Sequence, residues 1–254
     1  DAKSTIETGK AILGIELGST RIKAVLIDQE NKPIAQGNHT WENQLVDGLW
    51  TYSIEAIWSG LQDCYADLRS NVKNLYGIEI ENLAAIGVSA MMHGYMPFNA
   101  KEEILVPFRT WRNTNTGRAA AALSDLFVYN IPLRWSISHL YQAILDNEAH
   151  VKDIDFLTTL AGYVHWQLTG EKVLGIGDAS GMLPIDPTTH NYSAEMVAKF
   201  DKLIAPNQYN WTLQDILPKV LSAGESAGVL TPEGSKKLDA SGHLKAGIPV
   251  CPPE

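Results

Sequence analysis

The chain is poor in cysteine, with only Cys64 and Cys251 among its 254 residues. Two cysteines so far apart do not make the disulfide framework of a small secreted domain. No cysteine or histidine spacing typical of a zinc site is present either. The sequence therefore predicts neither disulfides nor zinc, and it favours the reducing cytoplasm as the location of the protein.

Long apolar runs and an excess of positive charge are also missing. The apolar runs fall far short of the about 20 residues that cross a bilayer, and residues 1–10 lack the apolar core of a signal peptide. The formal charge is −9, and no basic patch is available to release counterions from a nucleic acid. We expect no membrane and no nucleic acid as partner, and a flexible polar leader at residues 1–10.

Several common ligand-binding motifs are absent. The sequence has no Walker-type phosphate loop, no G-x-S-x-G nucleophile elbow and no dinucleotide fingerprint. If the chain handles a nucleotide, it uses a hairpin rather than a glycine loop that opens a helix.

What the sequence does contain is a polar turn between two apolar runs near its start. The runs cover residues 11–17 and 22–27, and Gly18-Ser19-Thr20-Arg21 separates them. This pattern predicts two strands joined by a tight hairpin. Gly18 permits backbone geometry that a side chain would forbid.

The residues at this turn have the chemistry of a phosphate site. Small side chains leave backbone N–H groups open to an anion, Ser19 and Thr20 add hydroxyls, and Arg21 and Lys23 add positive charge. Glu16 places a carboxylate beside the same turn. Taken alone, these residues favour an ordinary hairpin with a polar tip over a phosphate site.

The rest of the chain reads as one α/β domain without repeats. The hairpin and a third strand form a meander, and a helix, a buried strand and more helices follow. This order matches the ribonuclease H-like layout, a mixed five-stranded sheet flanked by helices. The expected strands are 33–40, 83–89, a pair across 95–111, and 245–250. The expected helices are 54–76, 116–149 with a break at 130–132, 155–168 and 193–203, and residues 228–239 are expected to form a turn that leads into a helix.

Three further places could bind a ligand. His93 follows the buried strand, where ligands gather in α/β domains, although a lone histidine is as often structural. Trp111-Arg112-Asn113 suits a sugar, because an aromatic ring stacks on its apolar face and polar side chains bind its hydroxyls; a half-buried Trp at a domain edge is as common. Asp178 lies in a glycine-rich turn, where capping a helix is the simpler role. Core packing explains Trp135.

Taken in order, these segments resemble the N-terminal domain of the FGGY carbohydrate kinases, within the actin-like ATPase superfamily. The family's G-I-D-x-G-T-[ST] strand is matched by G-I-E-L-G-S-T at 14–20, and the Q-M-H-G of its xylulokinase-like members by residues 91–94. W-x-[ND], L-T-G-E, S-D-A-[SA]-G-T and K-x-G-[IL]-P-V are matched at 111–113, 168–171, 177–182 and 245–250. Residues 11–254 thus resemble the sugar-binding domain.

The resemblance implies a reaction and roles for the candidate residues. The family transfers the γ-phosphoryl group of Mg-ATP to a hydroxyl of a ketose or polyol, so ATP and Mg²⁺ are the expected cosubstrate and metal. Gly18, Ser19, Thr20 and Lys23 would face the phosphates, with Glu16 near the metal, which it would hold indirectly. The residues expected to bind the sugar are Met92, His93, Trp111, Arg112, Trp135 and Asp178.

Two departures from the family pattern matter. Glu16 stands where the family usually has Asp, which moves the carboxylate by ~1.5 Å, about one carbon–carbon bond. The family's catalytic Asp lies in a G-D-x-x-x-G motif after the K-x-G-I-P-V strand, and the sequence ends at Glu254 before such a motif. We therefore expect the catalytic base and the nucleotide-binding C-terminal lobe to lie outside this chain, and the chain alone to be inactive.

Three functions stay open from the sequence. The favoured one is a lobe of an ATP-dependent kinase for a ketose, with a pentulose such as xylulose or ribulose preferred. The second is a sugar-binding or regulatory domain without catalysis, and the third is another actin-like phosphotransferase. An apolar surface left for the missing lobe would favour self-association, for example as a homodimer.

Overall fold

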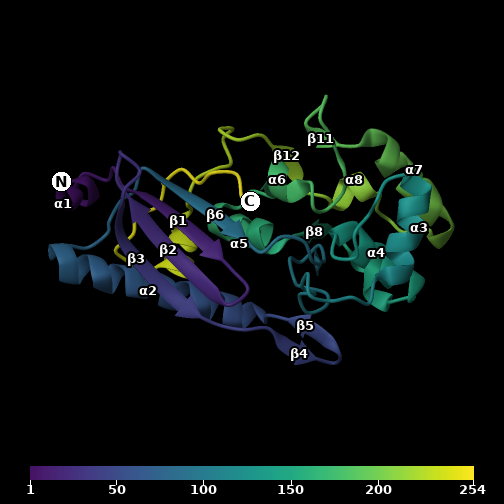
Figure 1. The fold of residues 1–254 in the computed structure, drawn as a ribbon, viewed down its shortest axis with the longest axis horizontal. Coiled ribbons are helices and arrows are strands. Elements are labelled where there is room, and N and C mark those ends of the chain that lie inside the picture. The colour runs from purple at the N-terminus through teal and green to yellow at the C-terminus, as the bar shows by residue number, and fades with distance from the viewer.

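A mixed sheet near the N-terminus organises the first half of the molecule. The computed structural model describes all residues, 1–254. The sheet has the order β3-β2-β1-β6, with β1 (Ile12–Leu17), β2 (Arg21–Ile27), β3 (Pro33–Thr40) and β6 (Ala85–Ala90). β1 pairs antiparallel with β2 and parallel with β6 (Figure 1). The predicted meander and the strand beside it are confirmed.

The C-terminal segment occupies the fifth position of this sheet. Val250 forms a parallel bridge to Ile86, and the Glu254 N–H donates to the Val88 carbonyl at 3.1 Å. The segment predicted as a strand at 245–250 is therefore a looser ribbon, which pairs with β6 from Pro249 onward. A five-membered mixed arrangement results, with helices packed against it.

The long helix α2 (Ile54–Tyr76) packs directly on this sheet. Ser53 caps its start by accepting a bond from the Ala56 N–H, and Gly77 ends it in a left-handed conformation. The approach is close, because a Cβ on Gly60 would lie 2.8 Å from Ile22 of β2. The helix predicted at residues 54–76 is confirmed with the same bounds.

Two hydrophobic cores divide the molecule. The first joins the sheet to α2, α5 (Leu160–Thr169) and α9 (Pro232–Leu238). The second lies among α3 (Gly117–Phe127), α4 (Ser136–Leu145), α7 (Ala194–Ile204) and α8 (Leu213–Ile216). Figure 1 shows the two halves side by side along the longest axis. None of the helices combines the length and the apolar composition that a bilayer-spanning helix needs.

Short segments depart from the sequence expectations. The polar leader contains a helix, α1 (Ala2–Glu7), whose Ile6 is buried. The helix expected from residue 155 starts only at Leu160, because the fully buried β8 (Phe156–Thr158) pairs with β7 (Met96–Phe98) instead. β7 therefore has β8 as its main partner, and only isolated bridges link residues 95–98 to residues 104–109.

The remaining elements are two to five residues long. A short hairpin, formed by β4 (Gln44–Val46) and β5 (Leu49–Thr51), projects from the body in Figure 1. The others are the 3₁₀ helices η1 (Ala149–Asp153) and η2 (Ala205–Asn207), the helix α6 (Ile176–Ala179), and the strands β9 (Val173–Gly175), β10 (Ile185–Asp186), β11 (Asn191–Tyr192) and β12 (Lys219–Leu221).

Candidate active site

A cavity of about 490 Å³ opens at the carboxyl ends of β1 and β6. These ends coincide because the two strands are parallel, with Glu16 opposite Ser89. The cavity is lined by every residue that the sequence predicted to face the phosphates. It is also lined by Trp111, which the sequence predicted to bind the sugar. Its lining consists of Glu16, Gly18, Ser19, Thr20, Arg21, Lys23, Ala90, Met91 and Trp111.

The backbone of the hairpin turn presents free donors to this cavity. The N–H groups of Ser19 and Thr20 donate to no acceptor within the chain, and both residues line the cavity. Gly18 keeps the turn tight, since its N–H donates to the Arg21 carbonyl at 2.9 Å and a Cβ there would lie 3.0 Å from that oxygen. Two adjacent unpaired N–H groups form a concave site suited to an anion.

The charged side chains around the turn are also unpaired. Glu16 and Lys23 face each other across β1 and β2, yet neither they nor Arg21 take part in any ion pair. Two cations and one carboxylate therefore remain available to a ligand. Positive charge beside free N–H groups favours phosphate.

The residues at this turn fit a magnesium ion bound together with phosphates. No cluster of three or more His, Cys, Asp or Glu side chains could hold a metal ion by itself. Mg²⁺ commonly takes one or two carboxylates and completes its octahedron with waters and substrate phosphates. Glu16 is the carboxylate in this cavity, and it would act in that way, directly or through a water.

The Met92-His93-Gly94 segment is held in a strained conformation against the second half of the molecule. His93 has φ +71° and Gly94 has φ +90°. The Gly94 N–H donates to the Arg134 carbonyl at 3.2 Å, and its carbonyl accepts from Ser136 Oγ at 2.6 Å. These bonds bring Trp135, at the start of α4, into the neighbourhood of the segment.

His93 itself is half-buried and points toward α6. Its Nδ1 lies 3.3 Å from the Gly181 carbonyl oxygen, which fits an Nδ1–H donor. Burial lowers the pKa of His93, so the imidazole is neutral at neutral pH. Met92 remains 38% exposed beside it, and the two residues form an edge that a sugar could contact.

The three side chains of the Trp111–Asn113 segment have different surroundings. Trp111 is 41% exposed and lines the cavity. Arg112 lies over the Trp50 ring, 3.6 Å from its centre. Asn113 is buried, and its amide pairs with the Trp50 backbone at 2.8 and 2.9 Å. Asn113 therefore fixes the β4–β5 hairpin and does not face a ligand.

Asp178 lies apart from the cavity. Only 2% of it is exposed, and Thr159 Oγ1 donates to its Oδ2 at 2.6 Å while Oδ1 has no partner. Burial raises its pKa to about 7. It lies inside the short helix α6 and not at its N-cap, which is Gly175. The structure does not support the capping role, and the expected contact of the enclosed Asp178 side chain with a sugar stays a prediction.

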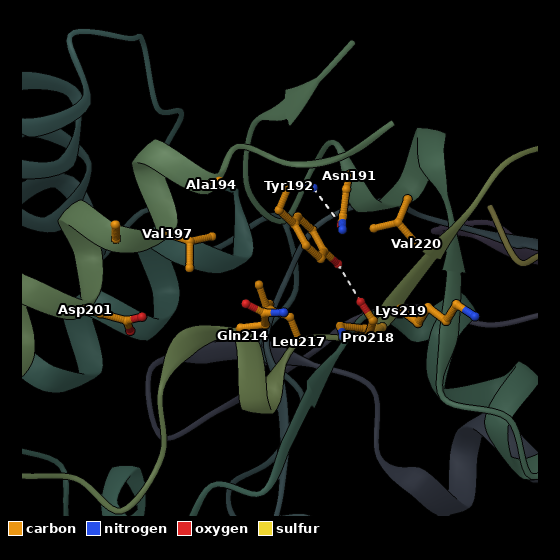
Figure 2. A pocket seen from close by; sticks show the side chains of 11 residues that line it. Asn191, Tyr192, Ala194, Val197, Asp201, Gln214, Leu217, Pro218, Lys219 and Val220 are labelled. Atoms are coloured by element: carbon orange, nitrogen blue, oxygen red, sulfur yellow. Dashed lines mark hydrogen bonds between the residues drawn. The ribbon is translucent and has the colours of Figure 1, made fainter. Parts of the chain in front are cut away.

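A larger cavity than the one at the hairpin turn lies in the second half of the molecule, and the sequence indicated none of its residues. It measures about 720 Å³ and lies between α7, α8 and β12. Figure 2 shows Val197, Leu217 and Val220 around it, with the Tyr192 hydroxyl donating to the Pro218 carbonyl at 3.1 Å. Six of its eleven lining residues are hydrophobic, and Asn191, Asp201, Gln214 and Lys219 add polar and charged groups.

Sequence reasoning missed Trp41 and Tyr52, which contact the hairpin turn from behind. The Trp41 indole N–H donates to the Gly18 carbonyl at 2.7 Å, and the Tyr52 hydroxyl donates to the Ser19 carbonyl at 2.5 Å. An aromatic residue 23 or 33 positions downstream gives no local signal of such a contact.

Known proteins resemble this chain over most of its length. The chain is 20% identical over 231 residues to a xylulose kinase of Escherichia coli. The aligned region covers 88% of this chain and 45% of that protein. The chain is also 21% identical to an L-fuculokinase of Salmonella typhi, covering 96% and 50%. The crystal structure of a gluconate kinase from Lactobacillus acidophilus matches with a TM-score of 0.77 at 18% identity, covering 95% and 47%.

The chain spans about half the length of the curated relatives it matches. The solved structures confirm the predicted fold, an α/β domain of the actin-like ATPase type with a mixed sheet and packed helices. The profile described as "FGGY family of carbohydrate kinases, N-terminal domain" matches residues 11–252. The chain therefore belongs to the FGGY family of carbohydrate kinases, as its N-terminal domain.

Proposed function

We propose that the protein transfers the γ-phosphoryl group of ATP to a hydroxyl of a ketose or polyol, and that this chain contributes the phosphate-facing turn and one wall of the sugar site. The observation that carries the proposal is the pair of free N–H groups at Ser19 and Thr20, beside unpaired Arg21 and Lys23. Transfer of this kind depends mainly on positioning and on neutralising the charge of the phosphoryl group.

The proposed sugar site adjoins the phosphate-facing turn. Trp111 lines the same cavity as Ser19. Met92 and His93 follow β6, and the end of β6 forms one edge of this cavity. The exposed ring of Trp111 would stack on the sugar, and the neutral imidazole of His93 would bind a hydroxyl. Trp135 would close the wall beside Gly94. A bound sugar would therefore lie between these residues and the turn.

A pentulose is the preferred substrate, supported by the Met92-His93 pair and by the relatives named as xylulose kinases. Other relatives are named L-fuculokinase and gluconate kinase, so the test below includes other sugars beside pentuloses. Mg²⁺ would be held at Glu16 together with the phosphates.

The test is a panel of ketoses, polyols and aldonic acids, each with Mg-ATP, in which ADP release is measured. The enzyme is a protein in which this chain is joined to a C-terminal nucleotide-binding lobe. We expect stimulation by a pentulose, and none by the chain alone. Turnover by the 254-residue chain alone would contradict the proposal that catalysis needs a second, nucleotide-binding lobe. Failure of every sugar would favour another phosphotransferase, and sugar binding without turnover would favour a binding domain.

A further inference from the structure

The carbonyl oxygens of Gly18, Ser19 and Thr20 in the hairpin turn all accept hydrogen bonds from two aromatic residues. Trp41 Nε1–H donates to Gly18 O at 2.7 Å and Tyr52 Oη–H to Ser19 O at 2.5 Å. The Trp41 backbone N–H donates to Thr20 O at 3.1 Å. Three successive carbonyls of the turn therefore have partners behind it.

This anchoring decides where the N–H groups point. In a trans peptide the carbonyl and the N–H lie on opposite sides of the chain. The peptide that carries Gly18 O also carries the Ser19 N–H, and the peptide that carries Ser19 O carries the Thr20 N–H. Holding the two oxygens toward Trp41 and Tyr52 thus turns both N–H groups the other way, and these N–H groups have no acceptor in the chain.

The two aromatic residues form a rigid support. Their ring centres lie 4.2 Å apart, and Tyr52 is almost fully buried while Trp41 is 9% exposed. Burial raises the pKa of Tyr52 to about 12, so its hydroxyl stays a donor throughout the physiological range. Tyr52 also stacks on Phe108 at 6.5 Å, in the segment that leads to Trp111.

We propose that Trp41 and Tyr52 are positioning residues for an anion: by binding the Gly18 and Ser19 carbonyls they preorganise the Ser19 and Thr20 N–H groups to receive a phosphate. The inference rests on the proposed function and adds two residues to it. Neither side chain touches the anion, and both act through the peptide groups of the turn. Preorganised donors bind an anion without having to reorient first.

The probe is inorganic phosphate, titrated into ¹⁵N-labelled protein while the amide resonances are followed by NMR. In the wild type we expect saturable shifts at the Ser19 and Thr20 amides. Tyr52→Phe removes one hydrogen bond and keeps the ring, so we expect phosphate to bind about fivefold more weakly. Trp41→Phe should have an effect of similar size, and it provides a second variant if the first does not fold.

A matched control is available on the same sheet. The Tyr76 hydroxyl donates to the Ile34 carbonyl at 2.6 Å, so Tyr76→Phe also removes a tyrosine–carbonyl bond to β3, away from the turn. It should lower stability by a similar amount and leave phosphate affinity unchanged. A role of Tyr52 in stability alone would make the two variants behave alike.

The outcomes separate the two proposals. If wild-type protein and Tyr52→Phe bind phosphate equally at Ser19 and Thr20, the positioning role is overturned and the phosphate site remains. If phosphate shifts neither amide in the wild type, the phosphate-facing role of the turn fails, and the positioning role fails with it. Weaker binding in Tyr52→Phe but not in Tyr76→Phe supports the inference.

Discussion

The hairpin turn and the wall of the expected sugar site, formed by the segments near residues 93, 134 and 181, are built in opposite ways. The turn comes from contiguous residues, is open to solvent, and leaves Ser19 and Thr20 N–H groups unpaired. The wall around His93 is assembled from segments near residues 93, 134 and 181, and its backbone groups are paired across long sequence separations. Substitutions in the wall should therefore cost mainly stability, whereas substitutions at the turn should cost mainly binding.

Asp178, beneath the wall, provides the largest expected effect. Burial raises its folded pKa to about 7, whereas an unfolded Asp titrates near its usual value of about 3.9. The folded state therefore binds more protons between these values, and stability falls as pH rises from 4 to 7. The loss from this group is about 4 kcal/mol at most, by linkage. Urea unfolding at several pH values measures it.

Asp178→Asn is the matched variant for that measurement. The amide oxygen can still accept the Thr159 hydroxyl bond, but the side chain no longer titrates. We expect the decrease in unfolding free energy between pH 4 and 7 to be smaller in the variant by the contribution of this one group. Identical pH profiles for the two proteins would show that Asp178 is ionised in the fold.

Gly94→Ala should give the next largest effect. Gly94 has φ +90°, and a Cβ would lie 2.7 Å from the Arg109 carbonyl oxygen and 2.8 Å from the Phe108 ring. We expect a loss of about 3 kcal/mol in unfolding free energy, from backbone strain and steric overlap together. Gly77→Ala is the control, because Gly77 has φ +71° with open space around it. It should cost about 1 kcal/mol, and equal losses would remove the steric part of the argument.

The same contrast explains what the sequence could predict. The turn, its flanking strands and helix α2 follow from local patterns, since alternating apolar residues and the caps Ser53 and Gly77 are signals within a few positions. The resemblance of ordered motifs predicted the family. The enclosure of Asp178 could not be predicted, because it depends on contacts with Thr159 and with the ribbon at Glu254. Trp41 and Tyr52 were missed for the same reason.

A substitution of Lys23 tests whether changes at the hairpin turn affect phosphate binding more than stability. Lys23→Met removes a cation that has no ion-pair partner in the chain, so the folded state loses little. We expect the affinity for inorganic phosphate to fall by about five- to tenfold, with a change in unfolding free energy below about 0.5 kcal/mol. Lys32→Met, an exposed lysine in the β2–β3 turn, is the control and should change neither quantity. A large loss of stability in Lys23→Met would contradict the distinction between turn and wall.

Substitution of Arg112 has the smallest expected effect. It tests whether Arg112 contacts the sugar or only supports the β4–β5 hairpin. Its guanidinium lies 3.6 Å from the centre of the Trp50 ring, and the charge also acts on Tyr52. Arg112→Met keeps an apolar contact with Trp50 and loses the cation–π attraction, so we expect a loss of about 0.5 kcal/mol in unfolding free energy. The KM for the sugar, measured with the two-lobed protein, then separates the two roles. A KM raised severalfold, with kcat unchanged, would show that Arg112 leaves Trp50 to bind a sugar hydroxyl. An unchanged KM would restrict Arg112 to supporting the β4–β5 hairpin and would leave Trp111 as the sugar contact in this segment.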